Sequence, residues 1–207
     1  MKVFVVGGAV GYINWIKNVE LVSKPENAKI VFFTGGEDVD PSIYGCKKHP
    51  STWSNIGRDL KEKEVFDAMT PNQLAIGVCR GSQFLCTMNG GLLVQDCRNH
   101  AVWGTHEITN GKDCYEITST HHQMQYPYVL PKENYDILFW ANGLSRGYYE
   151  GDKINPDIIT EKGEPEIVLY HNEDKPKCLA IQGHPEMMRY GILHEMLNKL
   201  IEKYADA

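Results

Sequence analysis

The fold is decided by residues 74–83, which read Leu-Ala-Ile-Gly-Val-Cys-Arg-Gly-Ser-Gln. The opening run of apolar and small residues predicts a strand buried on both faces, which is typical of a parallel sheet. A Gly-x-Cys-x-Gly pattern follows the strand directly, and a helical segment at 82–89 comes next and ends at Gly90-Gly91. Strand, sharp turn and helix together predict a nucleophile elbow with Cys79 at its apex.

The elbow accounts for both glycines and predicts a reactive thiol. Side chains at Gly77 and Gly81 would collide with neighbouring backbone in so sharp a turn. Cys79 would stand at a helix N-terminus, where unpaired N–H groups favour the thiolate, and the N–H of Arg80 would point into the same space as a donor to an oxyanion. We therefore expect Cys79 to react with iodoacetamide faster than the other five cysteines.

Similar segments recur along the chain. Apolar runs at 3–6 and 30–33 predict further buried strands, and helical spacing is present at 58–69 and 190–204. The alternation of strand and helix predicts an α/β three-layer sandwich with a mostly parallel central sheet. At 207 residues, a single domain over 1–207 is the expected organisation. The second half adds extended candidates in the manner of a small β-rich extension, at 115–118, 135–140, 167–170 and 178–181.

Composition and charge exclude several classes of protein. Hydrophobic residues make up 42% and charged residues 23% of the chain, which is the balance of an ordinary globular protein. The net charge of −6, without a basic patch, argues against nucleic acid or a membrane surface as a partner. No apolar stretch approaches the roughly 20 residues of a transmembrane helix. With no signal peptide pattern and six cysteines without C-x-x-C spacing, we expect reduced thiols and a cytoplasmic location.

Two further segments each follow an apolar run, and they carry groups that a cysteine nucleophile needs. His184 follows the run at 178–181, and Glu186 can hydrogen-bond one of its imidazole nitrogens while the other faces the thiol. Gly35 and Gly36 follow the run at 30–33, where backbone N–H groups could approach a ligand closely. Each segment alone is read most simply as a turn. Combined with the elbow, they favour a catalytic site at the strand ends.

The motifs, taken in order, resemble those of class I glutamine amidotransferase-like proteins. Within that family they are most similar to the peptidase C26 group, which includes γ-glutamyl-γ-aminobutyrate hydrolase. The resemblance covers most of the chain, and it implies a flavodoxin-like class I glutamine amidotransferase fold. The motifs are Thr-Gly-Gly-Glu-Asp-Val-Asp-Pro-Ser-Ile-Tyr-Gly at 34–45, Arg-Asp at 58–59, Gly-Val-Cys-Arg-Gly-Ser-Gln at 77–83 with Gly90-Gly91, Ser-Thr-His-His-Gln at 119–123 and His-Pro-Glu at 184–186.

The resemblance also implies a role for each matching residue. It makes Cys79 the nucleophile, His184 the base and Glu186 the residue that orients the base. It assigns the oxyanion hole to the N–H groups of Gly36 and Arg80, and substrate binding to Gly35, Gln83, His122 and Gln123. For His122 a polar loop position is an equal alternative. Two features depart from the family: Gly183 replaces the usual aromatic residue before His-Pro-Glu, and the short region before the first Gly-Gly motif predicts a reduced or missing first helix.

The activity implied is hydrolysis of the γ-amide of glutamine through a γ-glutamyl thioester, with no cofactor. Because the motifs fill most of the chain, a synthetase that receives the ammonia would be a separate polypeptide. A free-standing hydrolase of γ-glutamyl amines and a catalytically idle binding module are the alternatives. We expect no metal site, because His121 and His122 are adjacent and would point apart, and His106-Glu107 and His194-Glu195 lack the second histidine of a His-Glu-x-x-His motif.

Overall fold

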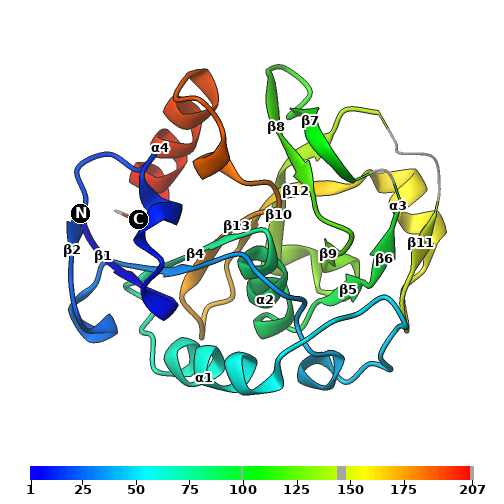
Figure 1. Cartoon of the computed structure of the whole chain (residues 1–207), viewed down its shortest axis with the longest axis horizontal. Helices are drawn as coiled ribbons and strands as arrows, with labels where there is room; N and C mark the ends of the chain where they lie inside the picture. Colours follow the sequence, from blue (N-terminus) through cyan, green and yellow to red (C-terminus); the bar gives the residue numbers. More distant parts are fainter. Residues whose placement is uncertain (99, 144–147, 206–207) are drawn as a thin grey trace.

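A nine-stranded mixed sheet forms the centre of the computed structural model, which describes residues 1–98, 100–143 and 148–205 (Figure 1). Its strand order is β2-β1-β3-β4-β13-β12-β10-β7-β8. The strands are β1 (Lys2–Val5), β2 (Glu20–Leu21), β3 (Ile30–Phe33), β4 (Leu74–Val78), β7 (Ala101–Thr109), β8 (Cys114–Thr120), β10 (Tyr135–Ala141), β12 (Pro165–Tyr170) and β13 (Lys177–Ile181).

The strands β2, β1, β3, β4 and β13 pair in parallel. Every residue of β3 and β4 is buried. Strands covered on both faces need apolar side chains at consecutive positions, and the runs at 30–33 and 74–78 have that character. The prediction of a mostly parallel central sheet is confirmed.

The remaining strands of the sheet, β12, β10, β7 and β8, are antiparallel. Two small two-stranded sheets stand beside them, one of β5 (Leu92–Val94) with β9 (Met124–Tyr126) and one of β6 (Asp96–Cys97) with β11 (Tyr149–Glu150). Side chains from these small sheets share an apolar cluster with Ile159 of α3 (Pro156–Lys162). The predicted β-rich extension is therefore present, and its larger part continues the central sheet.

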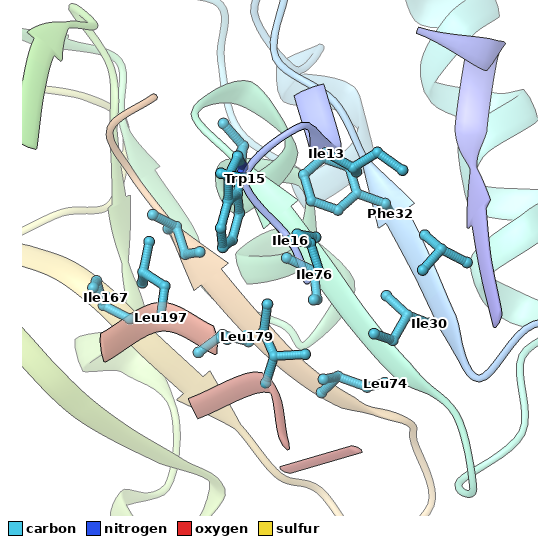
Figure 2. Close-up of a cluster of buried hydrophobic side chains, with 14 of the residues drawn as sticks. Ile13, Trp15, Ile16, Ile30, Phe32, Leu74, Ile76, Ile167, Leu179 and Leu197 are labelled. Atoms are coloured by element: carbon cyan, nitrogen blue, oxygen red, sulfur yellow. The ribbon is translucent and has the colours of Figure 1, made fainter. Parts of the chain in front are cut away.

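Helices cover both faces of the sheet (Figure 1). On one face, α1 (Ile56–Asp67) and α2 (Arg80–Met88) bring Phe66 and Phe84 against Phe33, with ring centroids 5.4–6.5 Å apart. On the other face, α4 (Ile192–Ala205) contributes Leu197 to the cluster drawn in Figure 2. This gives the three layers predicted from the sequence. Within the described ranges, no helix combines the length and apolar character needed to cross a membrane.

Short 3-10 turns, at Val6–Gly8 and Val10–Ile13, occupy the connection after β1 where a first helix would otherwise lie. The segment that follows them still contributes to the core, because Ile13, Trp15 and Ile16 pack in the same cluster as α4 (Figure 2). The Nε1–H of Trp15 donates to the carbonyl of Tyr12 over 2.9 Å and so fixes the end of the turns.

The carboxyl ends of β3, β4 and β13 meet at one edge of the sheet, because the three strands are neighbours and run in parallel. The glycine loop follows β3, Cys79 follows β4 and His184 follows β13. The topology therefore brings segments about 150 residues apart in the chain to one place, at the sheet edge where α/β folds usually hold their sites.

Candidate active site

Cys79 occupies a strained turn between β4 and α2. Its φ is 50° and its ψ is −110°, a conformation that residues with a side chain rarely adopt. A Cβ at Gly77 would lie 2.4 Å from the carbonyl oxygen of Gly81, and a Cβ at Gly81 would lie 2.2 Å from that of Phe33. The N–H of Cys79 donates to the carbonyl of Ile181 over 2.8 Å, which fastens the turn to β13. The turn thus has the geometry expected of a nucleophile elbow.

His184 is held in place by three groups. Its Nδ1–H donates to Oε1 of Glu186 over 2.7 Å, and its backbone N–H donates to Oγ1 of Thr118 over 2.6 Å. The ring is buried, with 6% of the residue exposed. The interaction of the ring with the Cys79 side chain is the third. Because Nδ1 is used by Glu186, the other ring nitrogen is the one available to the sulfur.

The electrostatics of His184 favour its protonated form. Burial alone would lower its pKa, but the interactions with the side chains of Cys79 and Glu186 and the negative charge of both outweigh it, and they raise the pKa from 6.5 to about 10. An imidazolium beside the sulfur can stabilise a thiolate and can later give a proton to a leaving group.

The glycine loop after β3 packs closely on its neighbours. A Cβ at Gly35 would lie 2.9 Å from Cε1 of His184, so this loop borders the histidine directly. Gly36 has a φ of 142°, and a Cβ there would lie 2.2 Å from Nη1 of Arg58. Arg58 donates from Nη2 to the carbonyl of Gly35 over 2.9 Å and from Nη1 to Oε2 of Glu37 over 2.9 Å. Only glycine fits this backbone, and the arginine fixes its course.

Arg80 anchors the start of α2 with a buried ion pair network. Its guanidinium bonds to Asp59 and Glu62 of α1, and all three side chains are at most 5% exposed. Asp59 also accepts from the backbone N–H of Asp40 over 2.8 Å, in the loop that follows β3. The side chain of Arg80 therefore holds α1, α2 and that loop together, while its backbone N–H lies in the first turn of α2, where N–H groups lack a helical acceptor.

Of the residues expected to bind substrate, Gln83 and Gln123 are linked by a hydrogen bond, whereas His122 is paired with carboxylates. Gln83 donates from Nε2 to the carbonyl of Gln123 over 2.9 Å. His122 donates from Nε2 to Oδ1 of Asp38 over 3.1 Å, and its Nδ1 lies 3.8 Å from a carboxylate oxygen of Asp96. The hydrogen bond that His122 donates to Asp38 is the main cause of the raised His122 pKa. The sequence had given no reason to place His122 between two carboxylates.

A comparison with known protein families identifies the family of this chain. The sequence profile of peptidase C26 matches residues 14–128, which is more than half of the chain. The chain belongs to the peptidase C26 family. The resemblance to class I glutamine amidotransferase-like proteins, stated above on five motifs, is thereby confirmed. The matched range ends before His184 and Glu186, so it assigns neither of them a role.

Relatives of this peptidase C26 chain carry related descriptions. It is 27% identical over 176 residues to YvdE of Lactococcus lactis, described as a candidate glutamine amidotransferase-like protein, over 80% of this chain and 72% of that one. It is 27% identical over 150 residues to protein NtpR of Enterococcus hirae, over 55% of this chain. The alignment spans 63% of that relative's length.

Solved structures support the fold. A protein of Thermoplasma acidophilum, described as a candidate GMP synthase subunit, aligns over 100% of this chain and 94% of its own, with a TM-score of 0.61 and 14% sequence identity. At that identity the likeness concerns the fold alone. It agrees with the class I glutamine amidotransferase architecture expected for a peptidase C26 member.

Tyr12 is the main site residue that sequence reasoning missed. Its ring centroid is 6.2 Å from that of His184, and its hydroxyl would lie 3.0 Å from a Cβ at Gly35. Burial and the charges of Glu186 and Cys79 raise the pKa of its phenol, so the hydroxyl stays protonated at neutral pH. Tyr12 and Gly35 also line a cleft of about 670 Å³ beside the site. A tyrosine in a non-periodic turn gave no signal, because the short 3-10 turns that aim it are set by tertiary packing.

Two groups of side chains bring metal-binding atom types together within the described residues. One combines His100, His106 and Glu166, which are mostly buried, and the other combines His49, Asp96 and Glu150 near the surface. Neither group was visible as a local motif, because its members come from separate parts of the chain.

Proposed function

We propose that the protein is a cysteine-dependent amidohydrolase in which Cys79, His184 and Glu186 act together on the γ-amide of glutamine. The observation that carries this proposal is the strained Cys79 turn next to a histidine that is oriented by Glu186 and interacts electrostatically with the Cys79 side chain. Nucleophile, base and orienting carboxylate in this order are the components that covalent acyl transfer requires.

The first half of the proposed reaction forms a thioester. The Cys79 thiolate attacks the carbonyl carbon of the γ-carboxamide, and the carbonyl oxygen becomes an oxyanion. The N–H groups of Gly36 and Arg80 are assigned to that oxyanion. Gly36 lies in a loop that Arg58 holds in place, and Arg80 begins α2 and is anchored by its own buried guanidinium. The intermediate collapses when the imidazolium of His184 gives its proton to the leaving nitrogen, which departs as ammonia.

The second half regenerates the thiol. His184, now neutral, takes a proton from water as the water attacks the γ-glutamyl thioester. Collapse of the second intermediate releases glutamate and returns the sulfur to the imidazolium. Glu186 keeps the imidazole in one orientation throughout, because it accepts from Nδ1 in both protonation states.

The fate of the ammonia is part of the same proposal. A class I amidotransferase domain can pass ammonia to a synthetase on another chain, and the similar Thermoplasma acidophilum protein is described as a candidate GMP synthase subunit. We place the acceptor on a separate polypeptide, in the cytoplasm, and we assign Gly35, Gln83, His122 and Gln123 to recognition of the glutamine.

The cleft beside Tyr12 favours a second candidate, a free-standing hydrolase of γ-glutamyl amines. The cleft has a volume of about 670 Å³, and its wall includes Gly35, which packs against the histidine that would protonate the leaving nitrogen. Ammonia needs no such space, whereas the amine of a larger γ-glutamyl amide would occupy it.

Glutamate release from glutamine and from a panel of γ-glutamyl amines separates the two candidates. We expect turnover that is abolished by Cys79→Ser and unaffected by Cys114→Ser, a change at an exposed cysteine on β8. Turnover of the amines alone would refute the amidotransferase function. Rates for Cys79→Ser equal to those of the natural sequence would support the idle binding module instead.

A further inference from the structure

Three histidines and two glutamates form a buried cluster outside the proposed triad. His106 lies in β7, Glu166 in β12, His100 and Glu164 just before these strands, and His121 just after β8. Four of the five are at least 97% buried, and His106 is mostly buried. One ligand atom from each of His100, His106 and Glu166 lies within 4.8 Å of the others. Strands that are hydrogen-bonded in one sheet hold these atoms together.

The hydrogen bonds of His100 leave one ring nitrogen without a partner. Its Nε2–H donates to Oε1 of Glu164 over 3.1 Å, and the same oxygen accepts from the hydroxyl of Tyr149 over 2.6 Å. When the ring is neutral, Nδ1 therefore carries a lone pair, and this buried atom has no hydrogen-bond partner among the described residues. A histidine whose far N–H is held by a carboxylate is the usual arrangement of a metal-ligating histidine.

The neighbouring pair is also incompletely satisfied. His106 donates from Nε2 to Oε1 of Glu166 over 2.8 Å, and Oε2 of Glu166 is buried without a partner in the described parts of the chain. His121 donates from Nδ1 to the carbonyl of Gln123, which leaves its buried Nε2 unpartnered in the same way. Several buried lone pairs in one place are unfavourable unless something positive occupies the space between them.

We propose that His100, His106 and Glu166 form a binding site for a divalent transition metal, with Zn²⁺ as the first choice. Two imidazole nitrogens and a carboxylate are a common zinc ligand set, and the three ligands leave one tetrahedral position for water. The ion enters between Nε2 of His106 and the carboxylate of Glu166 and displaces the proton that they share. Metal–ligand bonds of about 2.0–2.2 Å require the three atoms to draw together from their present separation.

The ion would tie β7 to β12 across the antiparallel part of the sheet, where β10 lies between them. The backbone carbonyl of Glu166 in β12 accepts from the N–H of Gln182 over 2.8 Å, two residues before His184. A metal here would stabilise the sheet beside the segment that leads from β13 to His184. The expectation of no metal site rested on motif spacings between neighbouring residues. Such spacings could not reveal this site, because its ligands are up to 66 residues apart in the sequence.

Calorimetric titration with Zn²⁺ tests the proposal on the whole chain after removal of bound metal. A Cys79→Ala background excludes binding by the thiol at the elbow. We expect one Zn²⁺ per chain, and a melting temperature that rises by roughly 5–10 °C at free Zn²⁺ 100-fold above its Kd. The absence of stoichiometric binding, or an intense thiolate-to-metal absorption band on substitution with Co²⁺, would overturn the site.

Variants locate the ion. His106→Gln and Glu166→Gln should each weaken Zn²⁺ binding more than about 100-fold, and Glu164→Gln, which removes the carboxylate that orients His100, by about 10–100-fold. His171→Gln is the matched control. It removes the histidine of an exposed pair on the same sheet, in which Nε2 of His171 lies 3.1 Å from Oδ2 of Asp136. Affinity that is unchanged in the ligand variants but lost in His49→Gln would place the ion in the other group and refute the proposal. His106→Gln should fold normally, since this side chain is 21% exposed.

Discussion

Replacing Arg80 with methionine would remove the cation from a buried network while leaving the backbone N–H of the proposed oxyanion hole in place. Asp59 and Glu62 would then lose their shared partner, and breaking a buried pair from one side costs about 3–5 kcal/mol. Glu62 keeps the bond from Nε of Arg58 and Asp59 keeps the bond from the N–H of Asp40, each of 2.8 Å. We therefore expect a loss near the lower end, about 3 kcal/mol in the free energy of unfolding.

Urea unfolding followed by the fluorescence of the four tryptophans measures this loss. For a chain of this size it corresponds to a fall in melting temperature of roughly 6–12 °C. The control is Lys63→Met, which breaks an ion pair with Asp67 on α1, the helix that carries Asp59 and Glu62. The side chains of Lys63 and Asp67 are 44% and 56% exposed. That pair is worth about 0.3–0.5 kcal/mol. A loss below about 1 kcal/mol for Arg80→Met, or equal losses for the two variants, would refute the account of Arg80.

Three further predictions concern the residues around the elbow. Iodoacetamide near neutral pH should alkylate Cys79 first, and labelling of the exposed Cys114 at an equal rate would count against an activated thiol. Because the pKa of His184 is raised from 6.5 to about 10, its protonation stabilises the fold fully below pH 6.5, and this contribution disappears as the pH rises through 10. In Cys79→Ser, urea unfolding at a series of pH values should show that this stabilisation is lost at lower pH. An unshifted profile would argue against the interaction between Cys79 and His184. Gly183→Ala should lower the free energy of unfolding by about 1–3 kcal/mol, since a Cβ there would lie 2.5 Å from a side chain of β8. Gly11→Ala, where a Cβ meets nothing within 4 Å, should change it little, and equal effects would show that packing at Gly183 is not the cause.

The strands that hold the site could be predicted because burial on both faces leaves a local signal. The runs at 30–33 and 74–78 coincide with β3 and β4, and the turn at Cys79 follows from its two glycines. The helix predicted from residue 58 begins at Ile56, because the side chain of Asn55 caps it by accepting from the N–H of Arg58 over 3.2 Å. Asn55 lies just before the apolar pattern from which the helix was predicted.

Features that depend on distant contacts could not be predicted from local patterns. The seven-residue α3 is too short to show a clear period, and it packs against the small sheets rather than the central one. Tyr12 reaches His184 only because Trp15 and its neighbours anchor the turns against α4. His106 and Glu166 are 60 residues apart and meet only when β7 and β12 join the same sheet. At Gly183, where the family usually has an aromatic residue, the side chain of Ile117 occupies the space that a Cβ would need.

Covalent capture at Cys79 tests the central proposal most directly. The intact protein is mixed with a glutamine analogue that carries an electrophilic ketone in place of the carboxamide, and the modified peptide is then located by mass spectrometry. We predict one adduct per chain, on Cys79, protection by excess glutamine, and loss of both labelling and glutamate release in Cys79→Ser. Glutamate release that persists in Cys79→Ser, or an adduct on another residue while Cys79 stays free, would contradict the proposed mechanism.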